Sequence, residues 1–189
     1  RRLKRIARIS DSYQFELQDI KTRFEQASRS DYLTGLSNRL DMYKRLEAER
    51  SRTARHGKPF AVIMADIDRF KEINDTFGHD LGDQVLVTIA RAFAGCLRGE
   101  DSCARWGGEE FLILLPETCG DDALAVAERL RGLAENLALE SGTSRIRVTI
   151  SLGVAVYAAG ENIDSCIKRA DDALYRAKNA GRNRSVLHV

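Results

Sequence analysis

The sequence predicts an α/β sandwich of the α+β kind, in which helices flank a central, mainly antiparallel sheet of five strands. Apolar segments of strand length and stretches of helical periodicity follow in the order helix, strand, helices, hairpin, helix, strand, helix, strand. With 189 residues, 43% of them hydrophobic and only two prolines, the chain suffices for one cored domain and an appendage. We expect the appendage over residues 1–30 and the domain over residues 31–189.

Residues 1–30 have the pattern of a helix that pairs with a second copy. From Leu3 to Ala27 no glycine or proline intervenes, and apolar residues recur at two heptad positions, as in a parallel coiled coil. A helix folded back onto its own domain is the alternative. Five of the first eight residues are Lys or Arg, which fits the cytoplasmic flank of a membrane helix as well as a solvated helix start. Because the sequence begins without Met, we expect a sensory or membrane part to precede it.

Composition argues against several classes of protein. The longest apolar runs are far below the ~18 residues of a membrane helix, and no signal-peptide pattern opens the chain. The first 30 residues hold eight Lys or Arg against four Asp or Glu, a surplus of four positive charges. Because the whole chain has a net charge of +2, residues 31–189 have a net charge of −2 and offer no basic surface for nucleic acid. Zinc and disulfides are disfavoured because no CxxC pair occurs. We expect a cytoplasmic protein whose full-length chain can be anchored to a membrane. We expect its cysteines to be reduced thiols: Cys96, Cys103, Cys119 and Cys166.

Helix caps and breakers predict the elements in order. Gly35 ends the first helix, and Ser37 or Asn38 is expected to cap a second one that runs through Glu49. After a polar connector at 51–59, we expect a strand at 60–65, a helix at 70–77, a turn at 78–83, a helix at 84–97, hairpin strands at 102–106 and 111–115, a helix at 121–139, a strand at 145–157, a helix at 163–180 and a strand near 185–189.

Two glycines followed by two carboxylates mark the hairpin. Gly107 and Gly108 predict a two-residue turn, because both positions of such a turn can need positive φ. Glu109 and Glu110 follow directly, and successive strand residues point to opposite faces, so one of them must meet a neighbour or a cation. Taken alone, this segment is more often an ordinary solvated hairpin.

A second acidic cluster strengthens the case that the hairpin carboxylates belong to a functional site. The apolar strand at 60–65 ends in Asp66-Ile67-Asp68, and the alternative to a site is that Asp66 or Asp68 caps the next helix. If the two strands are neighbours, Asp66 and Glu109 meet. Oxygen ligands of this kind suit Mg²⁺ or Mn²⁺, and such a site usually completes itself with substrate phosphates.

With these motifs in place, the chain resembles the GGDEF family, the diguanylate cyclases. Six segments stand in the family's order between Asp31 and about Ser185: DYLTGLSNR at 31–39, DIDRFKEIND at 66–75, GHDLGD at 78–83, RWGGEEF at 105–111, SLGVA at 151–155 and ALYRAKNAGRN at 173–183. Each segment is weak alone, but six in register are specific. Glu109 stands where the family's name has Asp, a variant that keeps the carboxylate.

The resemblance implies a fold related to the nucleotidyl cyclase and polymerase palm, and a reaction in which two GTP molecules condense to cyclic di-GMP and two pyrophosphates. Each subunit of a homodimer would hold one GTP, and two active faces would meet. By the same resemblance, Asp66, the Ile67 carbonyl and Glu109 would hold the metal, and Glu109 would also help to deprotonate the attacking 3′-hydroxyl. Glu110 would bind a second ion or face solvent.

Further positions match the family's substrate contacts. Asn74 and Asp83 correspond to its guanine-binding pair, although Asp83 can also cap the following helix. His79 either lines the site or packs structurally. Gly107 and Gly108 would let the nucleotide lie against bare backbone.

Three cations resemble the family's triphosphate contacts, namely Lys71, Lys178 and Arg182. Lys178 and Arg182 are four residues apart, so a helix would place them on one side. Upstream of the hairpin, Arg98 and Asp101 fit the family's RxxD inhibitory site for the product cyclic di-GMP, with Arg129 as partner. Two other functions stay open: an inactive module that senses GTP or cyclic di-GMP, and a cyclase or palm with another base preference.

Overall fold

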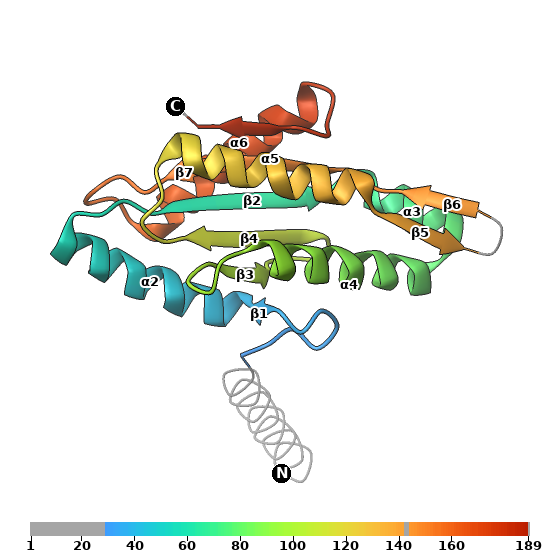
Figure 1. Cartoon of the computed structure of the whole chain (residues 1–189), viewed down its shortest axis with the longest axis horizontal. Helices are drawn as coiled ribbons and strands as arrows, with labels where there is room; N and C mark the ends of the chain where they lie inside the picture. Colours follow the sequence, from blue (N-terminus) through green and yellow to red (C-terminus); the bar gives the residue numbers. More distant parts are fainter. Residues whose placement is uncertain (1–28, 142–143, 189) are drawn as a thin grey trace, which may run out of the picture.

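The computed structural model describes residues 29–141 and 144–188, so the heptad pattern of residues 1–28 lies outside the described part (Figure 1). Helices lie on both sides of one long sheet, and a small separate hairpin stands at one end (Figure 1). The elements in chain order are β1 (Ser37–Asn38), α2 (Arg39–His56), β2 (Ala61–Ile67), α3 (Phe70–Phe77), α4 (His79–Cys96), β3 (Ser102–Arg105), β4 (Glu110–Leu115), α5 (Gly120–Asn136), β5 (Ala138–Ser141), β6 (Ser144–Arg147), β7 (Ile150–Val156), α6 (Ile163–Asn179) and β8 (Ser185–Leu187).

The main sheet has the order β1-β3-β4-β2-β7-β8. Its inner pairings, β3 with β4, β4 with β2 and β2 with β7, are antiparallel, whereas the short edge strands β1 and β8 pair in parallel. The predicted class is therefore confirmed, but the sheet has six strands in place of five, because the two-residue β1 has too little pattern to be seen in the sequence. The strand predicted at 145–157 is divided: β6 pairs with β5 in a separate two-stranded sheet, and only β7 joins the main sheet.

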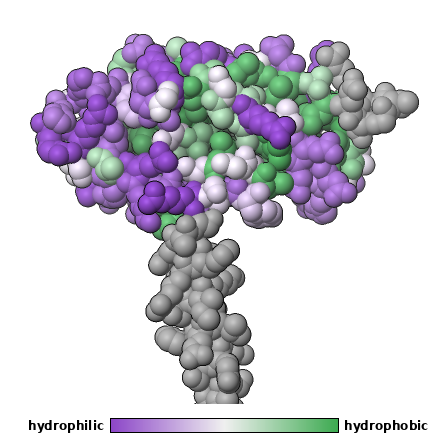
Figure 2. Space-filling model, turned by 60° about the horizontal axis from the view of Figure 1, so that its bottom comes forward, coloured by the Kyte–Doolittle hydropathy of each residue, from purple (hydrophilic) through white to green (hydrophobic). Residues whose placement is uncertain are grey.

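Two expectations from composition concern membrane spans and cysteines. Among the residues that the structure describes, no helix is long and apolar enough to cross a membrane. On the face seen in Figure 2, hydrophilic residues cover both sides and apolar residues reach the surface between them. All four cysteines are unpaired, and burial raises the pKa of the Cys103 thiol to about 12.

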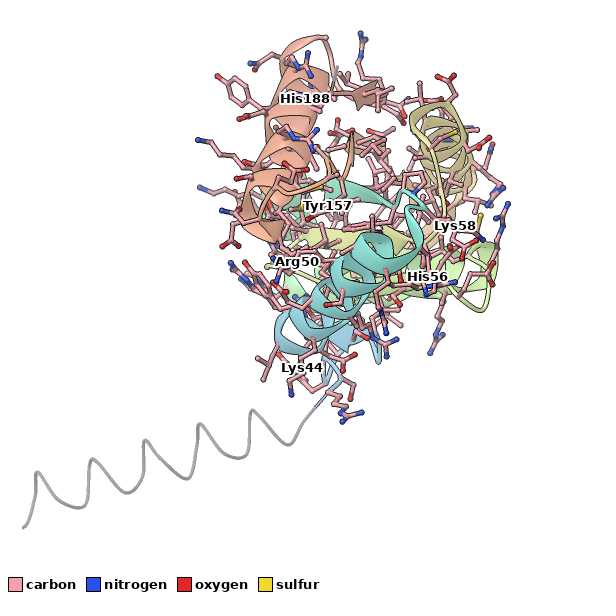
Figure 3. All side chains as sticks on the ribbon, turned by 90° about the vertical axis from the view of Figure 1, so that its left-hand side faces the viewer. Lys44, Arg50, His56, Lys58, Tyr157 and His188 are labelled. Carbon is pink, nitrogen blue, oxygen red and sulfur yellow. The ribbon has the colours of Figure 1, made fainter. Side chains whose placement is uncertain are left out.

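Two helices are longer than the sequence suggested. Asn38 caps α2 by accepting a hydrogen bond from Asp41 N, as expected, but the helix continues to His56 through the predicted connector. Figure 3 shows Lys44, Arg50 and His56 along its solvent side, which explains why this segment looks like a polar loop. The predicted turn at 78–83 is also wrong, because α4 begins at His79 directly after Gly78, whose φ is 85°.

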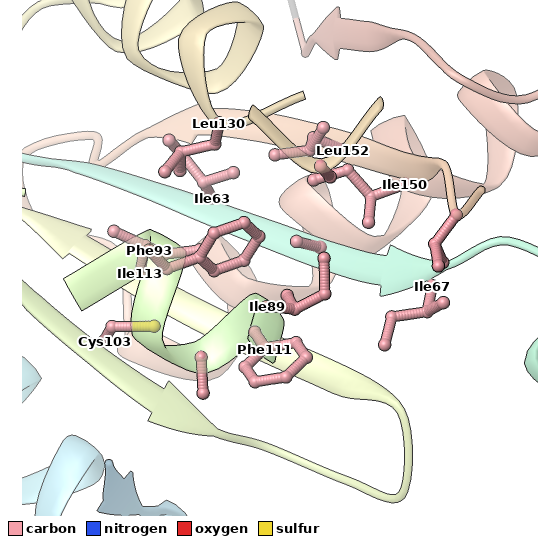
Figure 4. Packing of buried hydrophobic residues seen from close by; sticks show 14 of the residues in the cluster. Ile63, Ile67, Ile89, Phe93, Cys103, Phe111, Ile113, Leu130, Ile150 and Leu152 are labelled. Carbon is pink, nitrogen blue, oxygen red and sulfur yellow. The ribbon is translucent and has the colours of Figure 1, made fainter. Parts of the chain in front are cut away.

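Alternate residues of β2 serve two cores, because side chains alternate between the faces of a strand. Ile63 and Ile67 lie in the core under α4 and α5, whereas Val62 and Met64 pack with α2 and α6. Figure 4 shows the first core, where Phe93 of α4 meets the sheet; its ring lies edge-on to Phe111 with centroids 5.5 Å apart. The even-numbered positions at the end of β2 therefore face the α2 and α6 side.

The hairpin between β3 and β4 is not the predicted two-residue turn. Its loop comprises residues 106–109, and Trp106 N and Gly107 N both donate to the carbonyl of Glu110, at 2.8 and 3.3 Å. Neither Gly107 nor Gly108 has positive φ. A Cβ at Gly107 would lie 2.5 Å from Glu110 Oε2, so a larger residue there would displace the end of the Glu110 side chain, whereas a Cβ at Gly108 would meet open space.

Candidate active site

The site begins where β2 and β4 end side by side. Asp66 is the direct cross-strand partner of Glu110, and Ile67 N donates to the carbonyl of Glu109 at 3.3 Å. Directly opposed residues share a face of the sheet, so the Asp66 and Glu110 carboxylates face the same side. As successive strand residues, Glu109 and Glu110 were expected to point to opposite faces of the sheet. Glu109 lies in the loop before β4, so this rule does not apply to it. The predicted neighbour of Asp66 was Glu109, whereas its direct cross-strand partner is Glu110, and Glu109 lies one position earlier beside Ile67.

Helix α6 brings a cation to these acids. Lys178 Nζ lies 2.8 Å from Oδ2 of Asp66, a carboxylate that is only 6% exposed. The helix can approach because β7 has a glycine beneath it: a Cβ at Gly153 would stand 2.0 Å from the carbonyl oxygen of Ala170. A larger residue at this position would lift α6 from the sheet and carry Lys178 away from Asp66.

Burial and mutual repulsion disfavour the charge on all three acids. Burial raises the pKa of Asp66 against the opposing pull of Lys178. Burial and the Asp66 charge raise the pKa of Glu109, and they do the same for Glu110. Three carboxylates thus share one ammonium group, and a further cation would relieve their repulsion.

The donor set fits a hard divalent cation. Within the described residues no three His, Cys, Asp or Glu side chains are arranged as a metal site, so the side chains would supply two carboxylates at most. Mg²⁺ is commonly held by one or two carboxylates and completed by substrate phosphates. Asp66, Glu109 and the backbone carbonyl of Ile67 fit that pattern. The alternative that Asp66 or Asp68 caps α3 is wrong, because Arg69 stands at the cap position and makes no side-chain cap bond.

The hairpin loop is tied to the start of the domain, which the sequence reasoning missed. Arg105 donates to the Gly108 carbonyl from Nε (3.1 Å) and Nη2 (2.8 Å), and its Nη1 lies 3.4 Å from Asp31. Asp31 also accepts from N and Oγ1 of Thr34. Burial opposes ionisation of Asp31, but these hydrogen bonds and Arg105 hold its pKa below the ordinary value.

A stack of side chains supports the same loop from α2. The Arg39 guanidinium lies 4.5 Å from the Trp106 ring centroid, and Tyr43 packs on Trp106 with centroids 5.0 Å apart. The Tyr43 hydroxyl donates to Asp164 of α6 at 2.9 Å. Arg39 also acts on Glu110, whose pKa it lowers against the larger effects of burial and Asp66. The arginine at the start of α2 was readable in the motif, but its contact with Trp106 required the fold.

The predicted guanine-binding pair lies on two successive helices. The Asn74 Oδ1 atom is buried and has no hydrogen-bond partner among the described residues. It lies over Gly82, where a Cβ would be 1.9 Å away, so this glycine makes room for the amide. Asp83 is exposed in the second turn of α4 and lines a cavity of about 310 Å³ with Leu33. The alternative that Asp83 caps a helix is wrong, because α4 starts at His79.

The remaining predicted substrate residues are more scattered. His79 is exposed at the first position of α4, so a packed structural role is wrong. Lys71 is exposed on α3. Arg182 lies beyond the end of α6 with a left-handed φ of 64°, so the helical spacing to Lys178 is wrong. Arg182 is nevertheless close enough to lower the pKa of Asp66.

The three residues of the predicted inhibitory site line one cavity of about 240 Å³. Arg98 and Asp101 close a turn, since Arg98 N donates to Asp101 Oδ2 at 2.9 Å and Asp101 N donates to the Arg98 carbonyl at 3.1 Å. Arg129, from α5, donates to Sγ of Cys96 at 2.9 Å. The structure thus brings these three residues together.

A cavity of about 430 Å³ is lined partly by α3 and shares only Arg182 with the predicted substrate contacts. Its wall includes Asp68 and Asn183, which the sequence analysis did not single out as site residues. The sequence suggests only a helix-capping role for Asp68. Its buried hydrogen bonds to Thr149 and Ser151 connect residues far apart in the chain and have no local sequence pattern.

Comparison with known proteins gives a consistent result. Residues 28–184 match the sequence profile described as "Diguanylate cyclase, GGDEF domain". Diguanylate cyclase DgcM of Escherichia coli K12 is 43% identical over 169 residues, which are 89% of this chain and 40% of DgcM. The chain thus spans less than half the length of this curated relative.

Two solved structures are similar in fold and sequence. The diguanylate cyclase SiaD of Pseudomonas aeruginosa, solved in complex with its activator SiaC, has a TM-score of 0.83 and 48% identity, covering 99% of this chain and 72% of SiaD. The coiled coil and GGDEF domain of DgcB from Caulobacter crescentus, in complex with c-di-GMP, has a TM-score of 0.81 and 31% identity, covering 96% of this chain and 97% of that one.

Proposed function

The chain belongs to the GGDEF family of diguanylate cyclases, and on that basis we propose that it condenses two GTP molecules into cyclic di-GMP and two pyrophosphates. One observation carries the proposal: Asp66 lies directly across from Glu110, the neighbouring Ile67 N donates to the Glu109 carbonyl, and Asp66 is ion-paired with Lys178. An inactive relative has no physical need to keep three mutually repelling acids at one strand end. Membership of the family supports a role for these acids at a nucleotide and a metal ion.

Asp66, Glu109 and the Ile67 carbonyl would hold Mg²⁺ or Mn²⁺. The ion supplies charge neutralisation at the α-phosphate, which is the main requirement of such a displacement. We assign to Glu109 the acceptance of the proton from the attacking 3′-hydroxyl, because it stands at the same strand end as Asp66 and the Ile67 carbonyl. Glu110 faces the same side as Asp66 and can contribute to a second cation.

The chain's cations would take the triphosphate. Lys178 exchanges Asp66 for phosphate when substrate is bound, and Arg182 and Lys71 approach the same group from the α6–β8 loop and from α3. The unpartnered Asn74 Oδ1 is an acceptor for the N–H groups of guanine, and Asp83 is a second one. Adenine presents a different pattern of donors, so we expect selectivity for GTP.

Two chains would be needed for one product, because each active site holds one of the two GTP molecules. The heptad pattern of residues 1–30 supports pairing through that segment, and we propose a homodimer in which two active faces meet. Tyr32, two residues after the segment, is 96% exposed, so its ring is available to pack against a partner chain. DgcB was solved with a coiled coil attached to its GGDEF domain, which is the arrangement we propose here.

Product inhibition is the regulation we propose for the second site. Arg98, Asp101 and Arg129 line one cavity, in which guanidinium groups can bind the phosphates or guanine of cyclic di-GMP. DgcB was solved in complex with c-di-GMP. Binding of the product at this cavity would lower activity as product accumulates.

The test is to incubate the chain with GTP or ATP and Mg²⁺ and to identify products by mass. We expect cyclic di-GMP and pyrophosphate from GTP, nothing from ATP, and no product from Glu109→Gln. Absence of a guanine-dependent product at high protein concentration would contradict the proposal and favour the sensing module. A cyclic product from ATP would instead favour a cyclase of another base preference.

A further inference from the structure

The loop that carries Arg182 has a strained backbone. Arg182 and Asn183 have φ values of 64° and 46°, so two consecutive residues with side chains are in the left-handed region. This region is disfavoured for residues with a Cβ, more for Arg than for Asn, and surrounding contacts are needed to impose it on two consecutive residues. Some feature of the structure must therefore hold this loop.

Asp68 supplies the first of these contacts. It is 6% exposed, and its Oδ2 accepts from the backbone N of Asn183 at 3.0 Å and from Thr149 Oγ1 at 2.8 Å. Its Oδ1 accepts from Ser151 Oγ at 2.7 Å. Both oxygens of a buried carboxylate are thus used to join the end of β2, the start of β7 and the Arg182 loop.

Helix α5 holds the same loop from the other side. The Asn183 side chain accepts from Arg131 Nη1 at 3.0 Å and donates to Glu135 Oε1 at 2.8 Å. Two residues further on, Ser185 N donates to Glu128 Oε1 at 3.1 Å. The loop also borders the 430 Å³ cavity, so there is space into which it can shift if these contacts are lost.

Arg182 itself is left free by this arrangement. Its backbone N donates to the Ala177 carbonyl at 3.1 Å, but within the described residues its guanidinium makes no hydrogen bond or ion pair. The backbone bond to Ala177 holds Arg182 on the last turn of α6, beside Lys178, which is paired with Asp66, so Arg182 lies at the edge of the candidate active site. A strained, doubly anchored loop that presents an unpaired guanidinium is arranged to bind an anion.

We propose that Asp68 and Asn183 are positioning residues that fix Arg182 for the terminal phosphates of GTP. The proposal rests on the proposed function and deepens it, because Asp68 touches neither substrate nor metal in this account. Neighbouring Asp66 faces Lys178, whereas Asp68 faces β7 and the loop. The two aspartates of one motif thus have separate tasks.

The experiment compares the binding of two ligands in the presence of Mg²⁺ by calorimetry. One is GTP with a methylene group between the α- and β-phosphates, which cannot release pyrophosphate; the other is GMP, which lacks the terminal phosphates. Asp68→Ala should weaken the analogue about 10-fold, the worth of one charge-assisted hydrogen bond, and GMP less than about 2-fold. A merely structural role would weaken both ligands equally.

Matched variants sharpen the comparison. Asp41 of α2 is also 6% exposed, and it accepts hydrogen bonds from Ser37 of β1 and Arg45 of α2. Asp41→Ala should therefore leave the ratio of the two affinities unchanged. Asp68→Asn should restore the ratio, because its carbonyl can accept from Thr149 and Asn183 while its amide donates to Ser151. Asn183→Gly keeps the left-handed backbone without the α5 contacts, and should weaken the analogue about 3-fold.

The outcomes separate this inference from the proposed function. If Arg182→Ala leaves analogue binding unchanged, the substrate role of Arg182 is wrong and the inference fails with it. If Arg182→Ala weakens the analogue but Asp68→Ala and Asn183→Gly do not, only the positioning inference is overturned. The double variant Asp68→Ala with Arg182→Ala should bind the analogue as tightly as Arg182→Ala alone, and this result would support the inference. If Asp68→Ala does not fold, Thr149→Val and Asn183→Gly decide the question in the same assay.

Discussion

Replacing Glu109 by Gln should stabilise the metal-free protein while abolishing turnover. Burial and the Asp66 charge raise the pKa of Glu109 despite the attraction of Lys178, so its ionised form is disfavoured in the fold. Two unit charges about 5 Å apart repel by ~1–3 kcal/mol at effective dielectric constants of 80 to 20. Because Glu109 is half-buried, we take the lower end, about 1 kcal/mol, or ~2–4 °C in Tm for a chain of this size.

The assay is thermal unfolding in a chelator and with Mn²⁺ added. Mn²⁺ at ten times its Kd should stabilise the wild type by about 1.4 kcal/mol and the variant by much less. The control is Glu117→Gln, since ion pairs with Lys58 and Arg52 lower the pKa of Glu117 and its neutralisation should not raise Tm. A lower Tm for metal-free Glu109→Gln, or an equal Mn²⁺ shift in both proteins, would refute the reasoning.

The same variant has a pH signature. A carboxyl whose pKa is higher in the folded than in the unfolded state destabilises the fold at neutral pH, and protonation at lower pH removes that cost. The Tm advantage of Glu109→Gln over the metal-free wild type should therefore shrink as the pH falls from 7 through the raised pKa of Glu109. An advantage that grows towards low pH would mean that the pKa is lowered instead.

Three further perturbations follow from single contacts. Gly153→Ala places a Cβ 2.0 Å from the Ala170 carbonyl and should cost about 2 kcal/mol, or ~5 °C in Tm by calorimetry; an unchanged Tm would mean that α6 does not pack this closely. Arg98→Ala should relieve inhibition by added cyclic di-GMP with little change in the initial rate, and an unchanged inhibition curve would count against the regulatory cavity. Asn74→Ala should raise KM for GTP about 10-fold or more and narrow the preference for GTP over ATP, measured by initial rates; an equal loss for both nucleotides would contradict a guanine-reading role.

The two strands that carry the site were predictable because each has a clear apolar pattern, one ending in Asp66 and one running from Phe111 to Leu115. That these strands pair was only a condition of the sequence argument, because α3, α4 and β3 separate them along the chain. The six motifs then identified the family. Which glutamate lies directly across from Asp66 was not predictable, because a loop of four residues and one of two give different registers.

Other details depended on tertiary contacts that have no local pattern. The Gly78 motif is typical of a turn, yet Gly78 directly precedes α4. The predicted helix start at Gln84 and the packed structural role of His79 were therefore both wrong. Arg182 follows Lys178 at helical spacing, but α6 stops at Asn179 and the loop beyond it is held by Asp68 from a distant strand. Long-range hydrogen bonds of this kind override spacing, and only the fold reveals them.

The divalent-ion site between Asp66 and Glu109 is the claim on which the enzyme assignment depends. A crystal of the protein grown with Mn²⁺ and the non-cleavable GTP analogue, measured at the manganese absorption edge, would locate the ion directly. The account predicts an anomalous peak bound by the Asp66 carboxylate, the Glu109 carboxylate and the Ile67 carbonyl, with Lys178 turned from Asp66 to phosphate. A bound analogue with no peak there, or with Lys178 still paired to Asp66, would contradict it.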